Sequence, residues 1–188
     1  MATVAVPDAE VGRVLAALRA AARFLLGLPR PARWLLPAGW MGLIWALSSF
    51  RPGPPGDGLQ FDLFSNLAHA FEFGVLALLL LPLAPREGEW VRAAPVVLGA
   101  IAAVAIGYGF VDEHHQSGVP GRDASVLDLL TDAVGVFCTL KVALYVIDPR
   151  ADAYGLRREL AAAVGLCLLA AGFSTVFGLV FGDGLWIR

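Results

Sequence analysis

Hydrophobic stretches without a single charged residue dominate the pattern of this chain. Three of them cover residues 34–50, 93–111 and 160–182, and they contain 17, 19 and 23 residues. A helix needs about 20 apolar residues to cross the hydrocarbon layer of a bilayer. The pattern therefore predicts a membrane-spanning helix in each of these three stretches.

Two further apolar stretches, residues 67–85 and 127–147, are interrupted by ionisable groups. Each is long enough to cross a bilayer only if its ionisable residues lie inside the span. We therefore expect an all-α fold, a polytopic membrane helix bundle with five transmembrane helices. The first four would form a core, and the fifth would be added at the C-terminus.

The first 33 residues differ from the rest because Arg13, Arg19 and Arg23 recur in an Ala/Leu-rich helical pattern. Arg19 and Arg23 are one turn apart and share a face. This pattern predicts an N-terminal amphipathic helix in the cytoplasmic interface of the membrane, with a flexible tail as the alternative. The chain then divides into an N-terminal segment 1–33, a four-helix core 34–147, a cytoplasmic loop 148–159, and the fifth helix with a short outer tail, 160–188.

Basic residues are distributed unevenly between the two sets of loops, and short cytoplasmic loops are the ones enriched in Lys and Arg. The expected outer loops and tail carry three arginines, Arg51, Arg122 and Arg188. The expected inner side carries ten, which are Arg13, Arg19, Arg23, Arg30, Arg33, Arg86, Arg92, Arg150, Arg157 and Arg158. We therefore expect a cytoplasmic N-terminus and an extracytoplasmic C-terminus.

Polar side chains from four helices converge on the outer membrane face in this topology. At 1.5 Å per residue, Glu72 and Asp132 would each lie roughly 8 Å inside their helices. Carboxylates at that depth are costly unless they are paired, protonated or hydrated, which makes them candidates for function. The predicted polar pocket consists of Ser48, His69, Glu72, Glu113, His115, Gln116, Arg122, Asp128 and Asp132.

Several of these polar residues also have a purely structural interpretation. Ser125 and Asp128 have the spacing of a capping box at the start of the fourth helix. Arg122 can pair with a neighbouring acid, and Asp112 is interpreted as a solvated helix end. His115 rather than its neighbour His114 is expected to face inward, because adjacent helical residues point about 100° apart.

Composition and motifs narrow the function further. A net charge of −2 and the lack of a basic stripe argue against nucleic acid as a partner. The two cysteines form no CxxC motif, and no HExxH or G-x-S-x-G element is present. We therefore expect no cofactor and assign no catalytic residue. A divalent metal bound by His69, Glu72 or His115 is kept as an alternative.

Three segments together carry a family resemblance: "WALSSFRP", "NLAHAFEFGVLALLL" and "YGFVDEHHQSGVPGRDASVLDLLTDAVG". The chain resembles the VanZ-like family of bacterial membrane proteins over about residues 40–147. Positions that match the family pattern are His69, Asp112, Glu113, Gln116, Pro120, Gly121, Arg122, Ser125, Asp128 and Gly135. The chain departs from that pattern where Ser65 and Asn66 replace an Asp-Lys pair and where Asp132 replaces an Asn.

The resemblance implies a multi-pass protein of the bacterial cytoplasmic membrane, in a family whose founding member is linked to teicoplanin resistance. We expect a pocket that binds a cell-envelope component, such as a lipid-linked precursor or a glycopeptide, with membrane lipids as further partners. The alternatives are an intramembrane metal-dependent hydrolase acting on a lipid-linked substrate and a structural bundle with an internal polar network. Gly99, Ala103 and Gly107 form a small-residue stripe that allows either close packing within one chain or a homodimer.

Overall fold

The computed structural model describes residues 8–50, 58–120 and 124–181. This part of the chain forms six α-helices, a short 3-10 helix and a small β-hairpin. The elements are α1 (Asp8–Gly27), α2 (Arg30–Ser48), α3 (Gly58–Leu80), η1 (Leu81–Leu83), β1 (Arg86–Glu87), β2 (Trp90–Val91), α4 (Pro95–Gln116), α5 (Val126–Ile147) and α6 (Ala153–Phe181).

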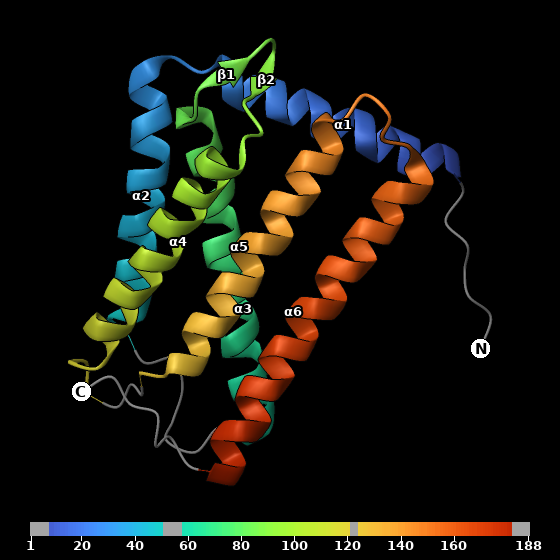
Figure 1. Ribbon diagram of the computed structural model, residues 1–188. Helices are drawn as coiled ribbons and strands as arrows, with labels where there is room; N and C mark the ends of the chain where they lie inside the picture. Colours follow the sequence, from blue (N-terminus) through green and yellow to red (C-terminus); the bar gives the residue numbers. More distant parts are fainter. Residues whose placement is uncertain (1–7, 51–57, 121–123, 182–188) are drawn as a thin grey trace.

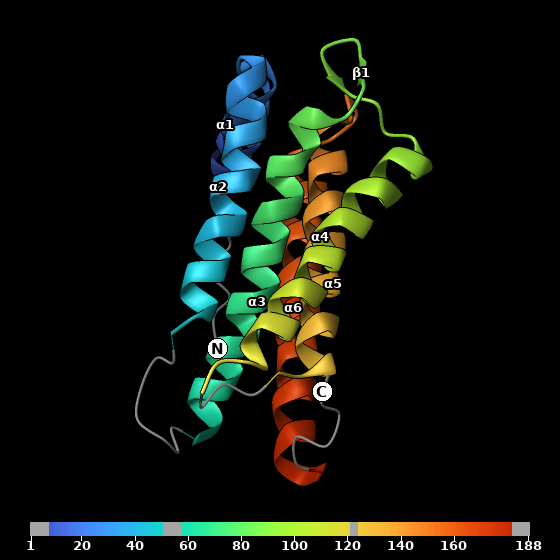
Figure 2. The same ribbon diagram turned by 90° about the vertical axis from the view of Figure 1, so that its left-hand side faces the viewer.

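Helices α2 to α6 run lengthwise and alternate in direction, whereas α1 lies across one end of the bundle (Figure 1). The antiparallel β1–β2 hairpin lies at the same end as α1, as a view turned by 90° also shows (Figure 2). We call this end the α1 end and the opposite one the site end. The chain therefore reaches the site end where α2 and α4 finish and where α3 and α5 begin.

Local sequence signals explain where the elements start and turn. Pro95 occupies the first turn of α4, where its missing N–H costs no helix hydrogen bond. The side chain of Ser125 caps α5 by accepting a hydrogen bond from the backbone N–H of Leu127 at 3.1 Å. Gly88, with φ of 64°, supplies the left-handed residue that the hairpin turn requires.

The interface between α3 and α5 is the most extensive in the bundle. A Cβ atom at Gly135 of α5 would collide with the backbone of Ala70 in α3, so this glycine sets how closely the two helices approach. Phe73, Leu76 and Val136 are fully buried beside this seam and belong to the main hydrophobic core. The tight seam holds the N-terminal half of α5 against the middle of α3.

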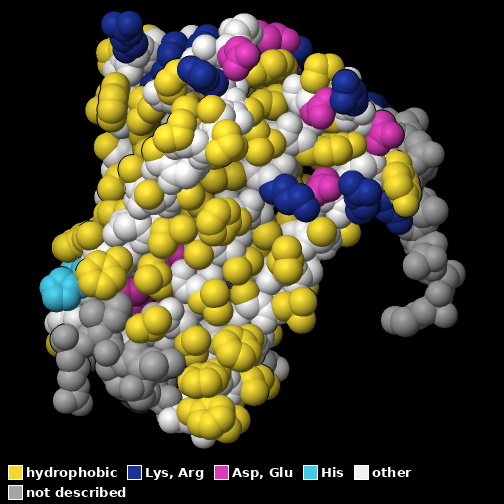
Figure 3. All heavy atoms as spheres, viewed as in Figure 1, with side chains coloured by type: hydrophobic (Ala, Val, Ile, Leu, Met, Phe, Trp, Pro, Cys, Tyr) yellow, Lys and Arg dark blue, Asp and Glu magenta, His cyan; other side chains and the backbone are white. Residues whose placement is uncertain are grey.

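Large hydrophobic side chains remain exposed along the sides of the bundle, and charged ones gather toward the α1 end (Figure 3). Four helical segments are long and apolar enough to cross a membrane: Asp62–Leu83, Pro95–Gln116, Val126–Ile147 and Ala153–Phe181. An apolar exterior on helices of this length is typical of membrane spans. The chain is therefore a multi-pass membrane protein with an all-α membrane part.

The predicted first span corresponds to α2, which is not among these four segments. This 19-residue helix includes Arg30 and Arg33 in its first turns and Pro37 in its interior, and these residues lower its average hydrophobicity. It nevertheless packs lengthwise beside α3 and α4. A fifth crossing by α2 remains a prediction.

Two helices start earlier than the hydrophobic pattern indicated. The pattern placed the start of the second span at Leu67, but α3 already begins at Gly58 and so contains Asn66 in its interior. Helix α6 begins at Ala153, inside the stretch expected to be a loop, because Asp152 accepts a hydrogen bond from the backbone N–H of Gly155 at 2.7 Å. Both helices thus begin with turns of mixed polar and apolar residues ahead of the uninterrupted apolar runs.

The N-terminal segment forms the helix α1, which packs against the bundle through one side. Leu15 and Leu26 are buried there, while Arg13 and Phe24 are exposed. The guanidinium of Arg19 donates to the carbonyl oxygens of Val146 at 2.8 Å and Asp148 at 2.7 Å, at the end of α5. Whether α1 lies in the cytoplasmic interface of a membrane remains a prediction.

Candidate functional site

Buried polar side chains form a cluster at the site end, between α2, α3, α4 and α5. Asp112, Glu113 and Asp132 are fully buried, and Ser48, His69 and Gln116 are at most 5% exposed. We call the following set the polar cluster: Ser48, His69, Asp112, Glu113, Gln116, Asp128 and Asp132. Four helices contribute to it, so residues from distant parts of the sequence meet here.

His69 occupies the centre of the polar cluster. Its Nδ1 atom lies 3.1 Å from Asp132 Oδ1, at hydrogen-bond distance, and 3.8 Å from Glu113 Oε1. Gly109 of α4 makes room for the Asp132 carboxylate, because a Cβ atom at this glycine would collide with Asp132 Oδ2. His69 therefore contacts carboxylates from two neighbouring helices, α4 and α5.

Glu113 links the end of α4 to the start of α5. Its Oε2 atom accepts a hydrogen bond of 2.8 Å from the backbone N–H of Ser125, the residue that caps α5. In a capping box, the acidic residue at the third helical position accepts from that N–H, and Asp128 holds this position here. The capping role expected for Asp128 is thus taken in part by Glu113, from another helix.

Gln116 connects the polar cluster to α2. Its Nε2 atom donates to Asp112 Oδ2 at 2.8 Å and to Ser48 Oγ at 3.4 Å. Asp112 was expected to be a solvated helix end, and this expectation is wrong because the residue is fully buried. Asp112 and Gln116 are four residues apart and therefore share the inward face of α4.

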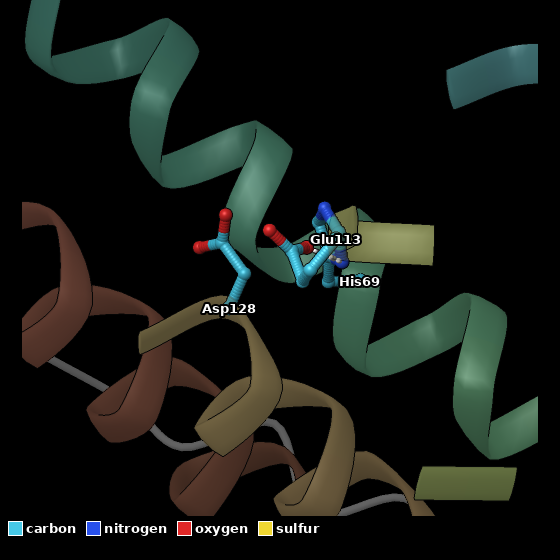
Figure 4. Close-up of side chains that lie close together, drawn as sticks. All are labelled: His69, Glu113 and Asp128. Atoms are coloured by element: carbon cyan, nitrogen blue, oxygen red, sulfur yellow. Dashed lines mark ion pairs between the residues drawn. The ribbon is translucent and has the colours of Figure 1, made fainter. Parts of the chain in front are cut away.

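Three members of the polar cluster have the arrangement of metal ligands. One ligand atom each from His69, Glu113 and Asp128 lies within 4.8 Å of the others. Figure 4 shows the Glu113 carboxylate between the imidazole of His69 and the carboxylate of Asp128. The three side chains come from α3, α4 and α5, so the packing of three helices defines this group.

Two residues of the predicted pocket, Glu72 and His115, lie outside the polar cluster. Glu72 is half-buried on α3 and does not belong to the three-residue group above. His115 is also half-buried: its ring stacks on Trp45 with centroids 3.7 Å apart, and its Nε2 lies 2.9 Å from Ser49 Oγ. Of the proposed metal ligands, His69 is retained, while Glu72 and His115 lie outside the group. Arg122 falls outside the described residues.

The sequence interpretation missed two polar contributions. Asp112 is the first, and its spacing from Gln116 was the signal that could have placed it inside. Asn66 is the second: its Nδ2 atom donates to Thr175 Oγ1 at 2.9 Å and connects α3 to α6 in a buried position. No short-range spacing could reveal this pair, because its members are 109 positions apart.

The comparisons with known proteins connect this geometry to a family. The family model described as VanZ/LLP1 matches residues 22–147, which is most of the chain and includes every member of the polar cluster. The chain belongs to the VanZ/LLP1 family. No curated protein and no solved structure matched the chain.

The VanZ/LLP1 segment runs from α1 to the end of α5, so the polar cluster belongs to the part of the chain that defines the family. Helix α6 lies beyond the matched segment and packs against α3 and α5. The matched segment thus ends together with α5, and the division of the chain into separate segments remains a prediction.

Electrostatics makes the polar cluster chemically unusual for a membrane bundle. It contains four carboxylates, and among the described residues the ion pairs of Glu113 and Asp132 are made with His69. Asp112 Oδ1, Glu113 Oε1 and Asp132 Oδ2 are buried and have no hydrogen-bond partner within the described part of the chain. Buried carboxylate oxygens are costly without a proton, a cation or a donor. The arrangement can therefore bind a cation or a donor-rich group.

Proposed function

We propose that this VanZ/LLP1-family protein of the bacterial cytoplasmic membrane binds the polar headgroup of a cell-envelope component at the polar cluster. One observation carries the proposal: four helices bury a set of acidic, imidazole and amide groups at one end of an apolar bundle. At the end of a membrane-spanning bundle, lipid headgroups lie next to the start of their acyl chains. Gln116 and Ser48 would bind polar atoms of the ligand while the apolar helix faces contact its chains.

The same proposal includes an orientation. Every described Lys or Arg lies in α1, in the first turns of α2, in the hairpin region, or near the junction of α5 and α6, which together form the α1 end. Short cytoplasmic segments carry an excess of these residues. The α1 end would therefore face the cytoplasm, and the polar cluster would face the outer leaflet.

Two ligand classes are consistent with this proposal, and burial favours one of them. Teicoplanin is a large glycopeptide, and the central carboxylates of the polar cluster are fully buried. The whole glycopeptide would therefore not fit against them. A lipid-linked precursor needs to insert no more than its headgroup. We therefore favour a lipid-linked ligand, and a role in teicoplanin resistance would follow from altered handling of that ligand.

Lipid retention by the full chain tests the proposed binding. The wild-type protein and Gln116→Leu would be purified from bacterial membranes, and their bound lipids would be identified by native mass spectrometry. We expect a distinct lipid species on the wild type and a loss of about tenfold in Gln116→Leu, because a buried amide that binds the ligand contributes roughly 1.4 kcal/mol or more.

Glu159→Gln is the control for this experiment, because it changes a nearly buried carboxylate of α6 that binds Lys141 at the opposite end. Equal lipid retention by all three proteins, with intact folding, would contradict the proposal. Saturable binding of added teicoplanin that depends on Gln116 would identify the glycopeptide as the ligand instead.

Hydrolysis of the ligand is a second candidate function, and the contact between His69 and Asp132 favours it. A histidine that is oriented by a carboxylate can take a proton from water, which would then attack an ester bond of the lipid-linked ligand. Incubating the purified protein with vesicles of total bacterial lipid extract tests this function. Disappearance of one lipid species, with its cleavage products, is expected for the wild type and not for His69→Ala.

A further inference from the structure

We infer that His69, Glu113 and Asp128 bind one divalent transition-metal cation inside the bundle. The inference rests on the proposed function, because it concerns the same polar cluster and names a partner of that site. It does not depend on which envelope component is bound. Three helices supply the ligands, so the cation would also connect α3, α4 and α5.

The distances within the group are compatible with a common cation. Zinc and similar metals bind nitrogen and oxygen ligands at about 2.0–2.2 Å, so two ligand atoms on opposite sides of one ion are at most about 4.4 Å apart. The ligand atoms of the three residues lie within 4.8 Å of one another. This limit slightly exceeds the separation of about 4.4 Å, so the side chains, which point toward one another in Figure 4, would have to rotate to meet at one ion.

Glu113 provides the independent observation that points to a cation. This side chain is fully buried, and its Oε1 atom has no hydrogen-bond partner in the described part of the protein. That oxygen faces the imidazole of His69 at 3.8 Å, which is beyond hydrogen-bond distance. A metal ion placed between the side chains would satisfy this oxygen without moving α4, which Glu113 fixes to the cap of α5 through Oε2.

The donor set indicates the class of metal. One imidazole and two carboxylates suit Zn²⁺ or Mn²⁺, whereas Mg²⁺ and Ca²⁺ prefer oxygen ligands alone. Three protein ligands are also the usual number in sites that keep a position for water or a substrate. In such a site, a headgroup oxygen of the proposed ligand would complete the coordination.

Asp132 would act as a positioning residue for this site. Its Oδ1 atom lies 3.1 Å from His69 Nδ1. When Nδ1 donates its hydrogen to this carboxylate, Nε2 is the nitrogen left to bind the cation, and the carboxylate fixes the orientation of the ring. Replacing such a partner commonly weakens metal binding about 10–100-fold. We therefore expect Asp132→Asn to bind the same metal more weakly, with unchanged stoichiometry.

Metal titration of the full chain in detergent tests the inference. The wild-type protein would be stripped with a chelator and titrated with ZnCl₂ and, separately, MnCl₂ by isothermal titration calorimetry. We expect one equivalent to bind to the wild type, no saturable binding to Glu113→Gln or Asp128→Asn, and unchanged binding to the control Glu159→Gln. Thermal unfolding checks the fold: metal should raise the melting temperature of the wild type and not that of Glu113→Gln.

The outcomes separate this inference from the proposed function. A wild type that binds neither metal stoichiometrically would overturn the inference, whether or not lipid is retained. Equal binding by wild type and Asp128→Asn would overturn it as well, because the metal would then lie elsewhere. Stoichiometric metal binding with no metal-dependent or Gln116-dependent lipid retention would leave the cation site established and would contradict the proposed function.

Discussion

Gly135 shows how one residue determines the geometry of the polar cluster. It lies one turn beyond Asp132 on α5 and directly against the backbone of Ala70, the residue that follows His69. Close contact of the two helices at this point brings Asp132 within hydrogen-bond distance of His69. The lack of a side chain at Gly135 is therefore one condition for the contact between His69 and Asp132.

We predict that Gly135→Ala destabilises the protein by about 1–3 kcal/mol, because the added methyl group must displace backbone atoms of α3. Thermal unfolding in detergent, followed by circular dichroism, measures the effect. Gly107→Ala is the matched control, since a Cβ atom there meets nothing within 4 Å and alanine favours helix. Equal stability of the two variants would show that the α3–α5 seam adapts to the extra volume.

Position inside an apolar span identified some residues of the polar cluster from the sequence and failed for others. His69 and Asp132 were expected inside because ionisable groups within an apolar span need partners, and the structure places them in contact. Asp112 was misjudged because acids at helix ends are commonly solvated, and its burial depends on how α4 packs against its neighbours. Glu72 was expected in the pocket but lies outside the polar cluster, because depth along a helix does not determine which way a side chain points.

At the scale of elements, the attachment of α1 depends on Arg19. The last carbonyl groups of a helix have no partner within that helix. Arg19 donates to two carbonyl oxygens at the end of α5, and its positive charge is favourable at that end of the helix dipole. Composition had placed this arginine at a membrane surface without indicating a specific partner.

We predict that Arg19→Met loosens α1 and lowers the free energy of unfolding by about 1.5–3 kcal/mol, the usual worth of hydrogen bonds made by a charged group. Methionine keeps most of the apolar stem, so the change isolates the guanidinium. Limited proteolysis near Gly27, together with thermal unfolding, measures the loss. Arg13→Met is the control, because the Arg13 side chain is 77% exposed and its partner Glu10 lies 3.8 Å away. If both variants were cleaved at the same rate, Arg19 would not be the attachment point.

Helix boundaries were the least predictable feature of the elements. Hydrophobic runs locate the apolar middle of a helix, but α3 and α6 both begin in segments where polar and apolar residues alternate. The existence of four long apolar helices was predictable, because each contains a run of sufficient length for a bilayer. Whether α2 crosses the membrane could not be predicted from its length alone, because two arginines and a proline lower its hydrophobicity.

For the whole molecule, the alternating direction of α2 to α6 separates two chemically different ends. Among the described residues, basic side chains occupy the α1 end, and the buried acidic polar cluster occupies the site end. If all five helices cross the membrane, Gly27 and Glu89 lie on one side and Ser117 lies on the other. The proposed function requires that Ser117 face outward, because an envelope component reaches the cluster from that side.

We therefore predict that single cysteines at these three positions react from opposite sides of the membrane. In a Cys138→Ala, Cys167→Ala background, Ser117→Cys should be labelled by a membrane-impermeant maleimide added to intact cells. Gly27→Cys and Glu89→Cys should be labelled only after the cells are opened. All three positions are exposed on the protein, so differences in labelling report the membrane barrier and not local burial. Labelling of Ser117→Cys only in opened cells would place the polar cluster in the cytoplasmic leaflet, and a Gly27→Cys that differed from Glu89→Cys would show that the topology around α2 is not the alternating one.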